Sequence, residues 1–100
     1  KQINLPKKIR IGTRWYSVEI VEAMRNKSEM GRIHYDRRVI ELAKRTHHGV
    51  PFRLSALEET FWHELTHAIL YDMGHHLHNN EHFVSAFANR LSNAIDSAKF

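Results

Sequence analysis

The chain has 100 residues, with 15 Lys and Arg against 11 Asp and Glu, which gives a formal net charge of +4. Its 42% hydrophobic and 26% charged residues are typical of a folded globular protein and exclude a disordered or fibrous chain. No apolar run approaches the roughly 18 residues of a membrane-spanning helix. The absence of cysteine excludes a disulfide framework, thiolate zinc sites, iron–sulfur clusters and cysteine nucleophiles. The length fits a single domain over residues 1–100, and since residues 1–8 do not resemble a secretory signal, we expect a cytoplasmic location and no membrane association.

Charge and histidine are unevenly distributed along the chain. Residues 1–53 carry 13 basic and 5 acidic side chains, a net charge of +8, whereas residues 54–100 carry 2 basic and 6 acidic side chains, a net charge of −4. Six of the nine histidines fall between positions 63 and 82, in the acidic half. Imidazoles are therefore concentrated where anionic oxygen ligands are also available.

Short strands are expected in the first half. Residues 9–22 alternate apolar and polar side chains on either side of Gly12-Thr13, which predicts a β-hairpin. Residues 22–29 contain few apolar side chains and fit either a short helix or a loop. A second pair of short strands is predicted at residues 32–35 and 39–43.

The first predicted helix covers about residues 56–73. Ser55 and Glu58 form a capping box, in which each side chain satisfies an otherwise unpaired backbone N–H. Gly74 can adopt the left-handed conformation that ends a helix. Apolar side chains cover most of the helix circumference, so we expect it to be sandwiched between the sheet and another helix. Its two apolar sides are Leu57, Phe61, Leu65 and Ala68, and Trp62, Ile69 and Met73.

The second predicted helix covers about residues 80–98, with Asn79 or Asn80 as its N-cap. An antiparallel or mixed sheet of about four short strands, followed by two packed helices, is an α+β architecture. A domain of this size buries only about 60–70% of its surface, so a bound metal would contribute to its stability.

The sequence His63-Glu64-Leu65-Thr66-His67 lies in the first predicted helix. Histidines four positions apart differ by only about 40° around a helix axis, so both imidazoles project from one face and can share a zinc ion. Glu64 lies beside that face, where it reaches a water molecule at the ion rather than the ion itself. The ion lowers the pKa of that water towards roughly 7, and the carboxylate takes the proton as the water attacks a carbonyl. The alternative is three polar residues on a solvated stripe.

A catalytic zinc site needs a third protein ligand and one open position. The candidates are Glu81 and the histidines at positions 75, 76, 78 and 82. Glu81 precedes the apolar stripe of the second helix at helical spacing and belongs at its inward edge, whereas His82 falls on the solvated face. Helical phase therefore selects Glu81, although a glutamate in the first turn is also favoured by the helix dipole without any metal. The stripe consists of Val84, Ala88, Leu91 and Ile95.

The two-histidine motif followed by Glu81 on a second helix resembles the gluzincin branch of zinc metallopeptidases, the thermolysin-type group, in its smallest prokaryotic and phage members. Residues 81–91 are similar to that group's glutamate helix. The resemblance implies a small zincin-like domain that hydrolyses peptide bonds. It implies one Zn²⁺ held by His63, His67 and Glu81, with Glu64 as general base and proton shuttle.

The resemblance covers about residues 31–91 and also concerns the substrate. It implies that a strand edge between residues 31 and 35 binds an extended peptide or protein by strand addition. Thermolysin-like enzymes carry an Asp one turn after the ligand Glu, where it orients a ligand histidine, and this chain has Ser85 at that position. A peptidase also needs a hydrogen-bond donor for the oxyanion, and Tyr71, Tyr35 and the histidines of residues 75–78 are all candidates.

Two other functions are compatible with the sequence. In a binding module without catalysis, zinc would be structural and His78 or His82 would close the fourth position. The basic residues of the first half, which include Lys8 and Arg10, could instead contact nucleic acid, as in a hydrolase acting on nucleic acid or in compact peptidases similar to the SprT type that act on DNA-bound proteins. The ordinary explanation of these charges is protection of strand edges.

Overall fold

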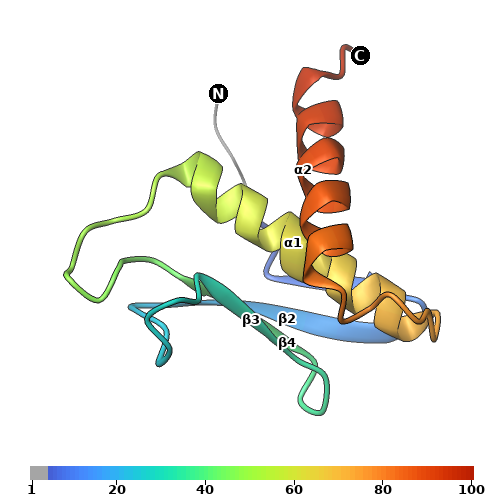
Figure 1. Ribbon diagram of the computed structural model, residues 1–100, viewed down its shortest axis with the longest axis horizontal. Coiled ribbons are helices and arrows are strands. Elements are labelled where there is room, and N and C mark those ends of the chain that lie inside the picture. The colour runs from blue at the N-terminus through green and yellow to red at the C-terminus, as the bar shows by residue number, and fades with distance from the viewer. Residues whose placement is uncertain (1–4) are drawn as a thin grey trace.

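Four strands and two helices are found in residues 5–100, the part of the chain that the computed structural model describes. The strands form one mixed sheet in the order β1-β2-β4-β3, in which β2 and β4 run parallel and the other neighbours antiparallel. The predicted α+β class, a sheet of four short strands followed by two helices, is confirmed (Figure 1). No helix in this part of the chain has the length and apolar character required to cross a membrane. The elements are β1 (Lys8–Ile11), β2 (Arg14–Val21), β3 (Gly31–His34), β4 (Val39–Ala43), α1 (Leu54–Asp72) and α2 (Glu81–Ser97).

The predicted hairpin is formed by β1 and β2, with Gly12 at φ +63° in the two-residue turn between them. Glycine adopts this conformation without the steric cost of a Cβ atom. Residues 22–30 form a loop, which decides between the two structures considered for this segment. The Asn26 Oδ1 accepts hydrogen bonds from the backbone N–H and the hydroxyl of Ser28 at 3.0 and 2.7 Å. Such local turn bonding competes with helix formation.

The edge strand β3 runs close beside α1. Gly31 makes this approach possible, because a Cβ atom there would lie 2.6 Å from the Thr60 Cγ2 of α1 and 2.9 Å from the Glu41 carbonyl oxygen of β4. The neighbouring strand β4 is central in the sheet and anchors β3 to the core. Its buried residues are Val39, Ile40, Leu42 and Ala43.

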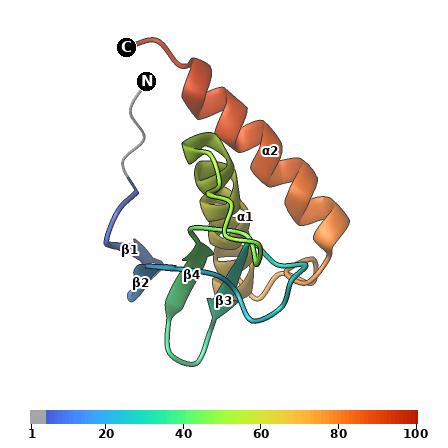
Figure 2. The same cartoon turned by 90° about the vertical axis from the view of Figure 1, so that its left-hand side faces the viewer.

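One apolar side of α1 packs on the sheet as predicted, and α1 also contacts α2, so it lies between the two (Figures 1 and 2). The other apolar side is covered less than predicted. Ile69 is 39% exposed and Met73, which follows the helix, is 65% exposed. The reason is that α2 crosses α1 instead of running along it (Figure 1). The core joins Leu57, Phe61, Leu65 and Ala68 of α1 to Ile11, Tyr16, Ile40 and Leu42 of the sheet.

The predicted capping box at the start of α1 is wrong. The helix begins at Leu54, its N-cap is Arg53, and no side chain forms a cap hydrogen bond there. Ser55 is therefore already inside the first turn. The chain just before the helix is fixed by tertiary contacts: the Phe52 N–H donates to the Lys44 carbonyl oxygen at 3.0 Å, and the Phe52 side chain packs against the core. This anchoring places the helix start ahead of the serine.

The connection between the helices begins and ends as the sequence predicts. Gly74 has φ +67°, its N–H donates to the Tyr71 carbonyl oxygen at 3.0 Å, and the next N–H donates to Leu70 at 2.9 Å. This is the Schellman arrangement that ends a helix on a glycine. Asn80 is the N-cap of α2, and its Oδ1 accepts from the Phe83 N–H at 2.9 Å.

Candidate metal centre

Two imidazoles project from one face of α1. His63 and His67 lie one helical turn apart, and their ring centroids are 4.9 Å apart with the ring planes at 67°. His67 is buried, and His63 is partly exposed. The motif therefore places both Nε2 atoms on the same side of the helix, where they can reach a single ion.

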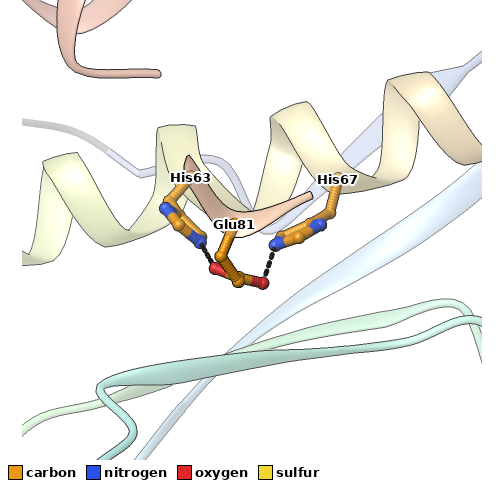
Figure 3. A group of neighbouring side chains, drawn as sticks. All are labelled: His63, His67 and Glu81. Atoms are coloured by element: carbon orange, nitrogen blue, oxygen red, sulfur yellow. Dashed lines mark hydrogen bonds and ion pairs between the residues drawn. The ribbon is translucent and has the colours of Figure 1, made fainter. Parts of the chain in front are cut away.

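Glu81 brings a carboxylate to these imidazoles from the first residue of α2. Its Oε1 lies 3.0 Å from the His63 Nε2, and its Oε2 lies 2.9 Å from the His67 Nε2 (Figure 3). One ligand atom from each of the three residues lies within 4.8 Å of the others. The structure thus brings together the three residues expected to bind metal, from two helices that cross at this point.

The donor atoms fit a zinc ion. The His67 Nδ1 lies 2.6 Å from the His78 carbonyl oxygen, which can only accept, so this nitrogen carries a proton. In a neutral imidazole the Nε2 then has a free lone pair, and this lone pair faces the Glu81 carboxylate. The His67 Nε2 and the Glu81 Oε2 are then both acceptors, and two acceptors remain 2.9 Å apart only when a proton or a metal cation lies between them. Donors bound to tetrahedral Zn²⁺ at about 2.0–2.1 Å would be about 3.3 Å apart, close to the observed spacing.

Glu64 lies beside the three candidate ligands but does not join them. Its side chain is buried, and the group of described residues that could hold a metal does not include it. Burial raises the pKa of Glu64 to about 7, with smaller contributions from Glu81 and Glu29, while Arg32 lowers it. A carboxyl group with a pKa near neutrality can both accept and return a proton.

A cleft of about 640 Å³ opens over this group. It lies between α1, the first turn of α2 and the edge strand β3 with the residues before it, so the candidate metal ligands face solvent through it. Its lining comprises Ser28, Glu29, Met30, Gly31, Arg32, Ile33, Tyr35, Ala56, Glu59, Thr60, His63, Glu64, His67, Asn79 and Glu81.

Of the candidate oxyanion donors, only Tyr35 lines the cleft. Burial, and then the nearby Glu64 carboxylate, raise the pKa of Tyr35 to about 12, so its hydroxyl keeps its proton. The Tyr71 ring stacks on the Tyr35 ring, with the two centroids 4.0 Å apart, and this contact restricts the orientation of the Tyr35 side chain. The histidines of residues 75–78 lie outside the cleft. The geometry therefore favours Tyr35.

The remaining histidines considered as third ligands do not reach the centre. Within residues 5–100, the group that could hold a metal contains only His63, His67 and Glu81. His82 is exposed, as helical phase predicts. His78 takes part through its backbone, because its carbonyl oxygen accepts from His67. No side-chain pattern signals such a backbone acceptor. The His78 carbonyl oxygen orients the His67 ring. In thermolysin-like enzymes an Asp has this role, at the position where this chain has Ser85.

The basic residues of the N-terminal half do not gather at the cleft. Lys8 and Arg10 lie on β1, at the sheet edge opposite β3, and the Lys8 Nζ lies 5.4 Å from the centre of the Trp15 ring. Arg32 is the only Lys or Arg among the cleft residues. It binds both carboxylate oxygens of Glu29, at 3.0 and 2.8 Å. This distribution favours edge protection as the explanation of the charge on β1.

Comparison with known proteins assigns no family to the chain. No protein-family model matches it, and neither curated proteins nor solved structures show significant similarity to it. The resemblance to gluzincins therefore rests on the residues of the two helices alone.

Proposed function

We propose that this protein is a zinc-dependent metallopeptidase that hydrolyses peptide bonds in a peptide or protein substrate. The observation that carries the proposal is the convergence of His63, His67 and Glu81 beneath an open cleft, with the Glu64 carboxyl group buried beside them. Two imidazoles and one carboxylate form a known donor set of catalytic zinc sites. A fourth position is left for water and substrate.

Each residue has a distinct role in this reaction. A bound zinc ion would lower the pKa of a water molecule and polarise the substrate carbonyl. Glu64 accepts the proton of the attacking water and passes it to the leaving amine, for which its pKa of about 7 is suited. In this proposal the Tyr35 hydroxyl, which lines the cleft, donates a hydrogen bond to the oxyanion of the tetrahedral intermediate.

The substrate backbone would pair with β3. This strand forms one edge of the sheet, and residues 30–33 line the cleft. An extended peptide added to that edge would run past the metal centre, with its backbone held by the unpaired groups of β3. Such recognition uses main-chain atoms and tolerates many side chains.

The geometry argues against the two other functions considered. A structural zinc site would need a fourth protein ligand, and neither His78 nor His82 belongs to the metal group formed by described residues. A nucleic-acid substrate would need cations at the cleft, where Arg32 is paired with Glu29. We therefore propose neither function.

The test combines metal analysis with one isosteric substitution. Purified protein should contain one zinc ion per chain and cleave quenched fluorescent peptides. Glu64→Gln should keep the zinc and lower kcat by about 10²–10⁴-fold, because the general base is removed while the ligands remain. Glu58→Gln, the same change on α1 outside the cleft, should leave activity unchanged.

Two results would contradict the proposal: purified protein that neither contains nor takes up zinc, or cleavage by Glu64→Gln at the wild-type rate. His67→Ala should lose the metal and the activity together. The cytoplasmic location expected from the sequence remains a prediction, which fractionation of cells that express the protein would test.

A further inference from the structure

The segment between the helices, residues 74–80, contacts both sides of the metal centre. It presents the His78 carbonyl oxygen to the His67 Nδ1 at 2.6 Å. It also contains Asn80, the N-cap that starts α2 immediately before Glu81. The orientation of one ligand imidazole and the position of the ligand carboxylate therefore both depend on the path of this segment.

His75 fixes that path through contacts in several directions. Its N–H donates to the Leu70 carbonyl oxygen at 2.9 Å, which holds it against the end of α1. Its carbonyl oxygen accepts from the His78 N–H at 3.2 Å and the His78 Nδ1 at 3.1 Å. Its ring Nδ1 accepts from the Leu77 N–H at 3.1 Å. The ring also lies nearly parallel to the Phe83 ring of α2, with centroids 6.5 Å apart.

We propose that His75 is a positioning residue for the metal centre, whose imidazole shapes the turn that delivers the His78 carbonyl oxygen to His67. The inference rests on the proposed zinc function and adds a residue outside the cleft to it. Any residue except proline could form the backbone hydrogen bonds of position 75. The ring acceptor for the Leu77 N–H is the contribution of this side chain, and without it that N–H loses its partner and the turn loosens.

The effect on the metal passes through the proton on His67. A carbonyl oxygen at the Nδ1 holds the proton there, which leaves the Nε2 lone pair free for the ion and fixes the plane of the ring. Removal of such an orienting partner typically weakens metal binding about 10–100-fold. Ser85, at the position where the resemblance points to an orienting Asp, is exposed. The turn at residues 75–78 supplies the orienting partner.

Three variants test the proposal. His75→Ala removes the acceptor, and His75→Asn restores one, because an Asn side chain accepts from the N–H two residues ahead in an Asx turn. His76→Ala is the matched control, since His76 stacks on His75 with ring centroids 4.7 Å apart but accepts no hydrogen bond in the turn. The Kd for zinc is measured for each by competition with a chromophoric chelator. The His67 Nδ1–H resonance is followed by NMR in metal-free and zinc-loaded protein.

His75→Ala should weaken zinc binding about tenfold or more, and its His67 Nδ1–H should exchange faster with water. His75→Asn and His76→Ala should stay within about threefold of the wild-type Kd. Wild-type affinity in His75→Ala, or no recovery in His75→Asn, would overturn the role of His75 while leaving the zinc site intact. If the wild-type protein binds no zinc, the proposed function fails, and the Nδ1–H exchange in metal-free protein still tests the turn.

Discussion

His67 contacts both the connection between the helices and the carboxylate of the candidate site. Its side chain is 7% exposed, its Nδ1 donates to the His78 carbonyl oxygen and its Nε2 points at Glu81. The Nδ1 therefore contacts the connection between the helices, and the Nε2 contacts the candidate metal centre. Among the described residues, His63 has Glu81 as its hydrogen-bond partner and packs edge-on against the His67 ring, and 24% of its side chain is exposed. Loss of His67 should thus disturb the site more than loss of His63.

The raised pKa of Glu64 predicts a pH-dependent stability difference in metal-free protein. Its pKa is 4.5 in the unfolded chain and about 7 in the folded protein. Between these values the folded state binds a proton that the unfolded state has lost, so the free energy of unfolding falls as pH rises and the full penalty is present above pH 7. Glu64→Gln removes that penalty. The variant should match the wild type near pH 4 and be more stable by about 3 kcal/mol at pH 8.

Urea unfolding of metal-free wild type and Glu64→Gln at a series of pH values measures this difference. The subtraction removes the contributions of the histidines, which both proteins share. Glu58→Gln, the same substitution on α1 outside the cleft, is the matched control. A Glu64→Gln difference that does not change with pH would show that Glu64 titrates normally in the folded protein.

At the scale of elements, the contact between β3 and α1 sets the width of the cleft. Gly31→Ala would place a methyl group 2.6 Å from the Thr60 Cγ2. Such overpacking should cost about 1–3 kcal/mol of stability, and β3 should move away from the helix. Thr60→Ser removes only that Cγ2 and keeps the hydrogen bond from the Thr60 Oγ1 to the Ala56 carbonyl oxygen.

The double variant Gly31→Ala/Thr60→Ser should therefore recover part of the loss, which chemical denaturation of the four proteins in a double-mutant cycle would measure. Recovery should be incomplete, because the Glu41 carbonyl oxygen also lies 2.9 Å from the new Cβ atom. Simple additivity of the two changes would mean that this contact does not limit the approach of β3.

Most elements could be predicted because their signals are local. Alternation marks the strands, Gly74 and Asn80 mark the ends of the connection, and helical phase places Glu81 towards the imidazoles. The helix start at Leu54 could not be predicted, because contacts of Phe52 with distant residues determine it and Ser55 gives a misleading local signal. The loop at residues 22–30 could not be predicted for a different reason, because its few apolar side chains favour no periodicity.

The candidate site was predictable to a different degree. The candidate metal ligands and the candidate general base follow from the spacing of side chains on helices. The choice of Tyr35 and the role of the His78 carbonyl oxygen depend instead on how β3 and the connection between the helices fold back onto α1. The first kind of contact is encoded by residue type at fixed intervals. The second joins residues far apart in the chain or uses backbone atoms, which every residue has.

At the scale of the whole molecule, the candidate metal centre lies where α2 meets α1. α2 lies against α1, not against the sheet, and its C-terminal half leads away from the rest of the protein (Figures 1 and 2). Only three residues of α2 are buried: Val84, Ala88 and Ser92. A metal ion bound by His63, His67 and Glu81 would therefore link α2 to α1 and add to the few packing contacts that hold α2 in place.

Zinc should accordingly raise the stability of the whole domain. At a free concentration about 100 times its Kd, zinc adds about 2.7 kcal/mol if it binds only the folded state. A domain of this size gains about 4–8 °C in Tm for each kcal/mol, so differential scanning calorimetry of metal-free protein should show a rise of about 10–20 °C on addition of zinc. Glu81→Gln should reduce that rise, because it replaces the carboxylate that α2 contributes to the candidate metal centre. Magnesium should leave Tm unchanged, since two imidazoles are poor ligands for that ion. An equal shift with magnesium, or an undiminished zinc shift in Glu81→Gln, would mean that the stabilising ion binds elsewhere.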